Sequence, residues 1–237
     1  KKIAPKLQHG ITHDFERKIY FIVFEWLETR IWKNLSKIIT SEPLCFHSDA
    51  AESMYKLRSS LFMATKMLHL AGIIHGDSKD EHVYLREKNG KILYDQIRLI
   101  DFGGCYLNPL DDWKGGSLGF SSPYFWNHRH RFSLSRREME AIDWYGVYSI
   151  LFYAFTGECF PGASPAFSKM PDSESDRYVQ AFYQELEYTL LNKWQNYPDD
   201  VRLFIAECVK YLCAPDALVI PNSLRLNVIR TGKRSNY

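Results

Sequence analysis

The chain has 237 residues, of which 46% are hydrophobic and 15% aromatic, a composition that fits a compact globular protein with a sizeable core and not a disordered chain. Its 30 basic and 28 acidic residues leave a formal charge of +2, so there is no strong signal for a dedicated nucleic-acid-binding or membrane-surface protein. Five cysteines without a C-x-x-C pair indicate neither a disulfide framework nor a zinc ribbon, and they favour an intracellular location, cytoplasmic or nuclear.

The first third of the chain predicts one strand followed by two helices. Residues 18–28, KIYFIVFEWLE, are a run of β-branched and aromatic residues that is typical of a buried strand. The apolar residues of segment 29–39 have the spacing of a short amphipathic helix. A longer helix is expected at 51–72, where the apolar residues fall mostly on one face and Gly72 provides a C-terminal stop.

The middle of the chain predicts a β-hairpin and a long loop. Residues 82–104 alternate apolar and polar side chains around Asn89-Gly90, which is a strong signal for a tight turn between two strands. Residues 105–136 are rich in turn-forming residues and poor in periodicity, and long loops of this kind are usually functional or mobile.

The last part of the chain predicts three helices. Residues 138–157 are apolar on almost every side, as in a helix buried at the centre of a domain, and Ser135 is a candidate N-cap for it. Two further helices are expected at 174–196 and 199–213. The apolar runs are far shorter than the roughly 18 residues that a membrane-spanning helix needs, so no membrane span is expected.

Polar residues with catalytic potential gather at two places. The segment IIHGDSKDEHVYL, which follows the predicted helix at 51–72, contains His75, Asp77, Lys79 and His82. The second arm of the hairpin ends in Asp101, followed by Phe and two Gly residues. Taken alone, the first segment fits a solvated turn as well as a catalytic loop, because such short motifs also arise by chance.

Together these two segments resemble the C-terminal lobe of the protein kinase-like superfamily. In that family a catalytic loop H-R-D-x-K-x-x-N precedes a hairpin ending in D-F-G, and here HGDSKDEH (75–82) precedes DFG (101–103). Gly replaces Arg, as in the aminoglycoside and choline kinase-like branch. His82 stands where Asn is expected, which is similar to bacterial lipopolysaccharide-core kinases.

The resemblance extends towards the C-terminus. The segment GSLGFSSPY (116–124) resembles the protein-kinase segment G-T-x-x-Y-x-A-P-E, although Tyr124 departs from the Glu. Asp143 lies 14 residues before Gly157, the spacing found in the buried helix of protein kinases, where this Asp accepts backbone N–H groups of the catalytic loop. The order and spacing of these matches make the resemblance specific.

The resemblance also covers the start of the chain. Residues 19–28 are similar to the strand that ends at the nucleotide-binding hinge, with Phe24 in the gatekeeper place and Glu25, Trp26 and Leu27 in the hinge. By this comparison Phe24, Glu25 and Leu27 are candidate nucleotide-binding residues.

The implied fold class is α+β, a kinase-like fold made mainly of the helical C-lobe with a catalytic-loop β-hairpin. Residues 1–28 would be a remnant of the N-lobe strands and the hinge, and residues 29–237 the helical lobe. Before the first strand there is no G-x-G-x-x-G motif and no V-A-I-K-like Lys, so the N-lobe is expected to be largely absent from this chain. Either the chain is a fragment, or the protein never had that half.

The resemblance implies a role for each polar residue. Asp77 would orient the attacking hydroxyl, Lys79 would offset charge on the transferred phosphoryl group, and His75 would brace the loop. Asp101 would hold the Mg²⁺ that accompanies ATP. His82 would be the second metal ligand, where an imidazole suits Mg²⁺ poorly and makes Mn²⁺ possible or a single-metal enzyme conceivable.

These roles imply an ATP-dependent phosphotransferase, and protein Ser/Thr is the favoured substrate because residues 116–124 resemble a substrate-positioning segment. Two alternatives stay open. One is a catalytically impaired pseudokinase that serves as a scaffold for a protein partner. The other is a small-molecule or carbohydrate kinase, which the HGD motif and His82 favour.

Overall fold

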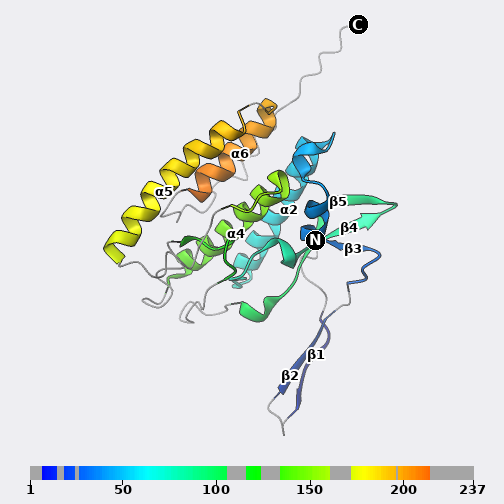
Figure 1. Ribbon diagram of the computed structural model, residues 1–237. Helices are drawn as coiled ribbons and strands as arrows, with labels where there is room; N and C mark the ends of the chain where they lie inside the picture. Colours follow the sequence, from blue (N-terminus) through cyan, green and yellow to red (C-terminus); the bar gives the residue numbers. More distant parts are fainter. Residues whose placement is uncertain are drawn as a thin grey trace.

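The computed structural model describes residues 7–14, 19–24, 27–105, 116–123, 134–160, 172–195 and 197–213. The helices are α1 (Leu35–Ser41), α2 (Ala50–Leu70), α4 (Arg136–Thr156), α5 (Asp172–Lys193) and α6 (Asp199–Leu212). The strands are β1 (Leu7–Asp14), β2 (Ile19–Phe24), β3 (Trp32–Asn34), β4 (Val83–Lys88) and β5 (Lys91–Leu99). Three short 3₁₀ helices are η1 (Leu44–Phe46), η2 (Asp80–His82) and η3 (Phe102–Gly104). Figure 1 shows a helical body with a small sheet on one side, and the β1–β2 pair projecting away from it.

Helix α4 is the centre of the helical body, and it lies between α2 and α6 (Figure 1). Sixteen of its residues are buried, as the apolar sequence of this segment predicts. The ring of Phe62 on α2 meets the ring of Trp144 edge to face at 5.2 Å, and Tyr148 stacks on Tyr211 of α6 at 4.0 Å. Each such side chain contributes about 1.5–3 kcal/mol when it is fully buried.

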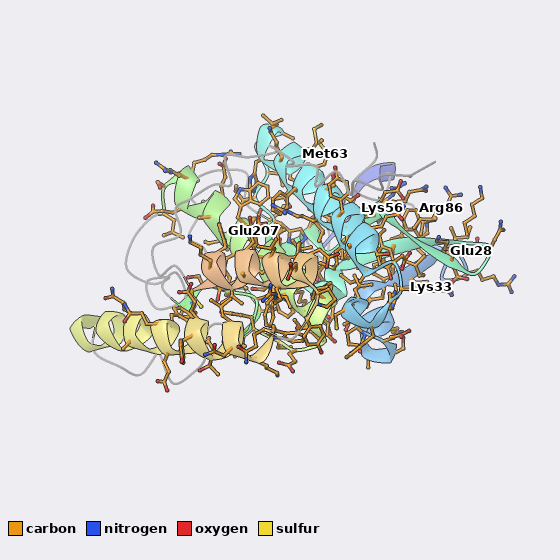
Figure 2. The ribbon with its side chains drawn as sticks, turned by 90° about the horizontal axis from the view of Figure 1, so that it is seen from above. Glu28, Lys33, Lys56, Met63, Arg86 and Glu207 are labelled. Atoms are coloured by element: carbon orange, nitrogen blue, oxygen red, sulfur yellow. The ribbon has the colours of Figure 1, made fainter. Side chains whose placement is uncertain are left out.

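One partly exposed charged pair joins three helices of this body. The guanidinium of Arg58 on α2 bonds the carboxylate of Glu207 on α6, and the hydroxyl of Tyr148 on α4 donates to Glu207 Oε1 at 3.4 Å. The Arg58 guanidinium also lies 5.2 Å from the centre of the Phe62 ring, within cation–π distance. Figure 2 places Glu207 on the α6 ribbon, far from the charged residues Lys33 and Arg86 at the sheet.

The predicted hairpin is confirmed. Strands β4 and β5 pair antiparallel, and they are joined by Asn89 and Gly90, whose φ angles are 53° and 73°. Both residues therefore occupy the left-handed region that Asn and Gly tolerate best, as a tight hairpin turn requires. The open end of this hairpin carries both the candidate catalytic loop, which precedes β4, and the candidate metal ligand Asp101, which follows β5.

The single helix predicted at 29–39 is wrong in its first half. Residues 32–34 form the edge strand β3, in which Trp32 pairs with Arg86 of β4, and helix α1 begins only at Leu35. The Arg98 guanidinium lies 4.6 Å from the centre of the Trp32 ring. Pairing with β4, which is distant in sequence, therefore outweighs the helical spacing of the apolar residues.

The other predicted elements are confirmed within a few residues at each end. The strand predicted at 18–28 corresponds to β2, although its expected burial lies outside what the structure describes; the long helix corresponds to α2, and the two last helices to α5 and α6. Only residues 105, 116–123 and 134–136 of the predicted long loop are among those described. No helix in the described part of the chain is long and apolar enough to cross a membrane. The division at residue 28 into a remnant and a helical lobe stays a prediction.

Candidate active site

One buried carboxylate of α4 binds the backbone of the candidate catalytic loop. Asp143 of α4 has no exposed surface, and its oxygens accept hydrogen bonds from the backbone N–H groups of His75 and Gly76, each at 2.8 Å. The ring Nε2 of His69, in the last turn of α2, lies 3.0 Å from Asp143 Oδ2, and Ser78 Oγ lies 3.5 Å from Oδ1. Asp143 thus fixes the backbone at the start of the loop, as the resemblance to protein kinases predicts.

Glycines allow the backbones to approach the loop from two sides. A Cβ atom added to Gly146 of α4 would lie 2.7 Å from the carbonyl oxygen of Ser78. A Cβ added to Gly116 would lie 2.8 Å from Ser121 Oγ and 3.0 Å from the carbonyl oxygen of Gly76. Real Cβ atoms essentially never come as close as 2.7 Å to an oxygen, so glycine is needed at position 146 for the helix to pack against the loop, and at position 116 a Cβ would require its neighbours to shift.

Asp77 and Lys79 lie together at the top of the loop. Asp77 Oδ1 accepts a hydrogen bond from the backbone N–H of Ser117 at 2.7 Å. Asp77 Oδ2 lies 3.9 Å from the ammonium of Lys79, which also pairs with Glu81 at 3.2 Å. The carboxylate is therefore oriented through one oxygen, and its other oxygen lies beside a positive charge.

His82 links the loop to Asp101. Its Nδ1 donates to the backbone carbonyl of Asp77 at 2.9 Å, and its Nε2 lies 3.3 Å from Asp101 Oδ2. Burial lowers the pKa of His82 from its ordinary value, against the opposing effect of the hydrogen bond to the Asp77 carbonyl. Asp101 adopts φ 60°, and its Oδ1 accepts from the N–H of Gly103 at 3.4 Å, so its side chain is turned towards the loop.

His75 connects the loop to the end of β5. Its Nε2 lies 3.0 Å from the carbonyl oxygen of Ile100, and its ring lies 5.1 Å from that of Phe102 and 5.7 Å from that of His82. The ring is 2% exposed, and Nδ1 has no hydrogen-bond partner among the described residues. This position is compatible with the bracing role expected for His75.

Comparison with known proteins identifies the fold. No protein-family model matches the sequence, and no curated protein matches it significantly. Among solved structures, the chain is similar to the crystal structure of the Rad53 kinase domain and SCD2, with a TM-score of 0.53 and 13% sequence identity. The chain has a protein kinase-like fold. The match covers 90% of this chain and 65% of that one, so the chain spans less than two thirds of the structure it matches.

Within this kinase-like fold, three of the expected catalytic residues lie together. The loop that Asp143 holds contains all three: His75, Asp77 and Lys79. The two candidate metal ligands, His82 and Asp101, lie close to one another beside this loop. The structure describes only two of the three candidate nucleotide-binding residues: Phe24 is the last residue of β2, and Leu27 is half-buried and precedes β3. Glu25 lies outside the described residues. Tyr124, the residue that departs from the kinase segment, also lies outside them. The roles of all these residues stay predictions.

The kinase-like fold implies a divalent cation, and the residues present fit one in part. Asp101 supplies an oxygen ligand of the type that Mg²⁺ prefers, on a side chain that is 59% exposed. His82 supplies a nitrogen instead of the amide oxygen expected at its position, and Mg²⁺ tolerates imidazole poorly. In the described ranges, no three His, Cys, Asp or Glu side chains form a ready metal cluster. Water and phosphate oxygens would have to complete the coordination.

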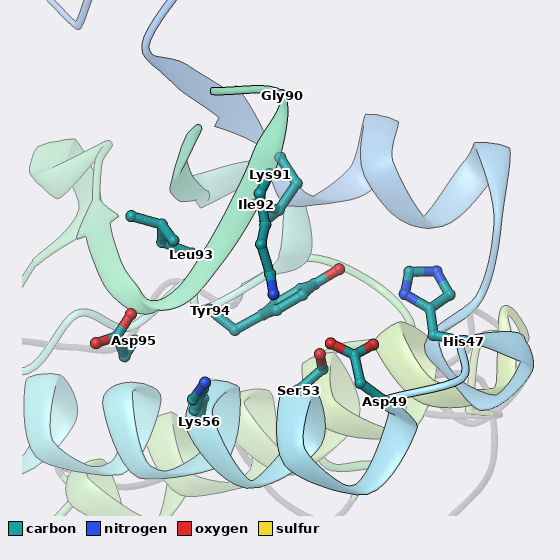
Figure 3. A pocket seen from close by; sticks show the side chains of 10 residues that line it. All are labelled: His47, Asp49, Ser53, Lys56, Gly90, Lys91, Ile92, Leu93, Tyr94 and Asp95. Atoms are coloured by element: carbon teal, nitrogen blue, oxygen red, sulfur yellow. The ribbon is translucent and has the colours of Figure 1, made fainter. Parts of the chain in front are cut away.

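One cavity lies away from the candidate catalytic loop. It has a volume of about 280 Å³ and lies between the first turns of α2 and the β5 arm of the hairpin (Figure 3). Its charged residues, Asp49, Lys56, Lys91 and Asp95, balance one another in sign. Burial raises the pKa of Tyr94, which lines it, to about 12. None of the candidate catalytic residues contributes to it, so it is not the candidate active site.

Sequence analysis missed three residues of the site. His69 contacts Asp143 from 74 positions away, and no local pattern distinguishes it from an ordinary polar residue at a helix end. Ser117 bonds Asp77 through its backbone, so its side chain carries no signal. Gly146 could have been found, because a glycine inside a strongly apolar helix often marks a close approach of backbones.

Proposed function

We propose that this chain is an ATP-dependent phosphotransferase that acts on Ser or Thr hydroxyl groups of proteins. The observation that carries the proposal is the position of Asp77: one carboxylate oxygen is held by the N–H of Ser117, and the other lies beside Lys79. Phosphoryl transfer depends mainly on positioning and on charge neutralisation, and these are the two properties that this pair provides.

Each residue has a defined task in this proposal. Asp77 Oδ2 accepts a hydrogen bond from the acceptor hydroxyl and holds it in line for attack. The ammonium of Lys79 offsets negative charge on the transferred phosphoryl oxygens. Asp101 is the carboxylate that binds the nucleotide's divalent cation, and the cation would neutralise the phosphate charge.

The segment 116–122 supports a protein acceptor over a small molecule. It lies directly against Asp77 through the Ser117 N–H, while the side chain of Leu118 is 46% exposed. An exposed apolar side chain on the residue after Ser117, whose N–H bonds the candidate catalytic carboxylate, can contact a residue beside the acceptor hydroxyl. A peptide chain has such a neighbouring residue, and a free sugar has none.

The test is a single-turnover assay of phosphoryl transfer from labelled ATP to a Ser/Thr peptide library. Asp77→Asn should lower the rate by roughly 10²- to 10⁴-fold, the usual contribution of a positioned acid–base group. Asp95→Asn, on an exposed position of β5, is the matched control and should leave the rate unchanged. Equal rates for Asp77→Asn and the unchanged protein would refute the role of Asp77. Labelling of carbohydrate acceptors in place of peptides would refute the substrate class.

A second candidate function is a catalytically impaired scaffold, and His82 favours it. In place of an amide oxygen it presents an imidazole beside Asp101, in a region where no three-residue metal cluster is found among the described residues. The melting temperature in the presence of metal and ATP separates the two candidates, because a ligand that binds only the folded state must stabilise it. A rise that Asp101→Asn abolishes supports the kinase, and no rise in the unchanged protein supports the scaffold.

A further inference from the structure

The cavity between the first turns of α2 and the β5 arm of the hairpin, here called the α2–β5 cavity, lies where β5 departs from regular pairing with β4 (Figure 3). The register of the pair shifts between Leu85 and Arg86, and residues 94–96 of β5 lie outside it. A β-bulge of this kind changes the direction of side chains and often lies next to a functional site. Here the irregular segment brings Tyr94 to the wall of the cavity.

Tyr94 brings a hydroxyl group without a partner to this cavity. The residue is 6% exposed, and its hydroxyl makes no hydrogen bond to any described residue. Figure 3 shows this hydroxyl directed towards the side on which His47 and Asp49 lie. Burial raises the pKa of the phenol to about 12, so the group is a neutral donor at neutral pH. Buried polar groups nearly always have a hydrogen-bond partner, which here has to be water or a ligand in the cavity.

Two opposite charges at the cavity also have no partner among the described residues. The Asp49 carboxylate, at the N-cap position of α2, makes no side-chain cap bond and no ion pair, and Lys91 of β5 makes no ion pair either. Lys56 is already paired with Glu52, and it separates Asp49 from Asp95 in Figure 3. The same view shows the Lys91 side chain extending from the hairpin towards α2. A carboxylate only accepts hydrogen bonds and an ammonium only donates them, so the two groups require opposite partners.

A ligand with a single charge would match only one of these two groups. An anion beside Lys91 would be repelled by the Asp49 carboxylate, and a cation beside Asp49 would be repelled by the Lys91 ammonium. A zwitterion matches both groups at once. Ligand pockets in proteins start at about 300 Å³, so a cavity of about 280 Å³ suits a molecule of the size of one amino acid.

We propose that the α2–β5 cavity binds a small zwitterion of the amino-acid class. The ammonium group of the ligand donates to Asp49, and its carboxylate accepts from Lys91 and from the Tyr94 hydroxyl. Its carbon side chain contacts the apolar part of the wall, which Ile92 and Leu93 provide. None of the candidate catalytic residues lines this cavity, so the proposal does not rest on the proposed function.

The experiment measures binding of L-phenylalanine to the full chain by saturation-transfer difference NMR, with a titration for the dissociation constant. Two derivatives each lack one of the charges: phenylalaninamide has no carboxylate, and N-acetylphenylalanine has no ammonium group. We expect each derivative to bind about 10- to 100-fold more weakly than L-phenylalanine, the usual contribution of a hydrogen bond to a charged group.

Variants assign each charge of the ligand to its partner. Lys91→Gln should remove the preference for L-phenylalanine over phenylalaninamide, and Asp49→Asn should remove the preference over N-acetylphenylalanine. Tyr94→Phe should weaken binding by about 3- to 10-fold, the contribution of one uncharged hydrogen bond. Lys88→Gln, at the exposed position that pairs with Lys91 in the hairpin, is the matched control for charge, and Tyr188→Phe is the control for the phenol. Both controls should bind as the unchanged protein does.

Absence of L-phenylalanine binding at millimolar concentration would overturn the proposal. Equal binding of N-acetylphenylalanine would overturn it in favour of an anion site, and equal binding of phenylalaninamide in favour of a cation site. Equal affinities of Lys91→Gln and Lys88→Gln would place the bound molecule outside the α2–β5 cavity. The melting temperature of each variant, compared with that of the unchanged protein, shows that the fold is retained. Because no nucleotide or phosphate acceptor is present, the outcome does not depend on whether the protein is a kinase.

Discussion

Asp143 shows how a charged side chain can be stable in the middle of an apolar helix. Removing a carboxylate from water is costly unless hydrogen bonds replace the lost hydration. Here the two oxygens receive backbone N–H groups from His75 and Gly76 and lie beside the ring of His69 and the hydroxyl of Ser78. The same bonds determine the course of the catalytic loop, so Asp143 both stabilises the fold and positions the loop.

Replacing this carboxylate should therefore be expensive. Asp143→Ala leaves the two buried backbone donors at 2.8 Å without an acceptor, and we expect a loss of about 3 kcal/mol in the free energy of unfolding, measured by urea denaturation. The exposed carboxylate of Asp95 is the control, and Asp95→Ala should stay within about 0.5 kcal/mol of the parent. A midpoint for Asp143→Ala equal to that of the parent would show that the loop does not depend on this residue.

Gly146 tests the close contact between α4 and the loop. Gly146→Ala adds a methyl group at 2.7 Å from the Ser78 carbonyl oxygen, which should displace the loop and cost about 1–3 kcal/mol of stability. Ser149→Ala, in the same helix, is the control: it removes a buried hydroxyl that has no partner among the described residues, and should be neutral or stabilising. If Gly146→Ala were as stable as Ser149→Ala, the helix and the loop would not be in contact.

The residue scale also shows what sequence can and cannot reveal. Asp77, Lys79, His82 and Asp101 could be placed together from sequence, because a motif with known spacing implies the hairpin that joins them. His69 could not, since its contact with Asp143 spans 74 residues and depends on how two helices cross. The direct approach of His82 to Asp101 likewise depends on the left-handed conformation of Asp101, which no sequence pattern specifies.

At the scale of elements, local chemistry predicts boundaries better than periodicity does. Ser135 begins α4 with a capping box: its side chain accepts from the N–H of Glu138, and the Glu138 carboxylate accepts from the N–H of Ser135 at 2.7 Å. The Asn89-Gly90 turn was equally predictable because both residues favour positive φ. By contrast, the start of α1 was misplaced, because strand β3 forms only when β4 is present to pair with it.

The cap of α4 gives a prediction at this scale. Ser135→Ala removes the side-chain acceptor for an N–H group in the first turn and should lower the free energy of unfolding by about 1 kcal/mol. Asp49 provides a contrast, because it occupies the same position at the start of α2 without making a side-chain cap bond. Asp49→Ala should therefore cost less. A larger loss for Asp49 than for Ser135 in chemical denaturation would contradict the capping assignment.

At the scale of the whole molecule, the helical body buries many weakly acidic groups. Tyr145 and Tyr183 face each other with their hydroxyl oxygens 3.3 Å apart, and Tyr148 bonds Glu207. Burial raises the pKa of all three phenols, because an ionised phenolate would lose its hydration. The composition of the sequence indicates an aromatic core, but only the packing of α2, α4, α5 and α6 decides which tyrosines it contains.

This burial makes the stability of the protein sensitive to alkaline pH. Burial raises the pKa of the Tyr94 phenol and of the Cys213 thiol to about 12, whereas in the unfolded chain they ionise near about 10 and 8.5. Between these values the folded state binds more protons than the unfolded state, so stability must fall as pH rises. The contribution of each group to the free energy of unfolding is fully present below its unfolded pKa and is lost as the pH rises to its folded pKa.

Urea denaturation at a series of pH values from about 8 upwards should therefore give a free energy of unfolding that falls progressively to pH 12, by at most about 1.4 kcal/mol per pH unit for each group. Tyr94→Phe should make the slope between about pH 10 and 12 shallower, since one titrating group is gone. Tyr188→Phe is the matched control: this side chain is 73% exposed, and its removal should leave the slope unchanged. Equal slopes for Tyr94→Phe and Tyr188→Phe would mean that the Tyr94 hydroxyl is open to water in the folded protein, contrary to the structure.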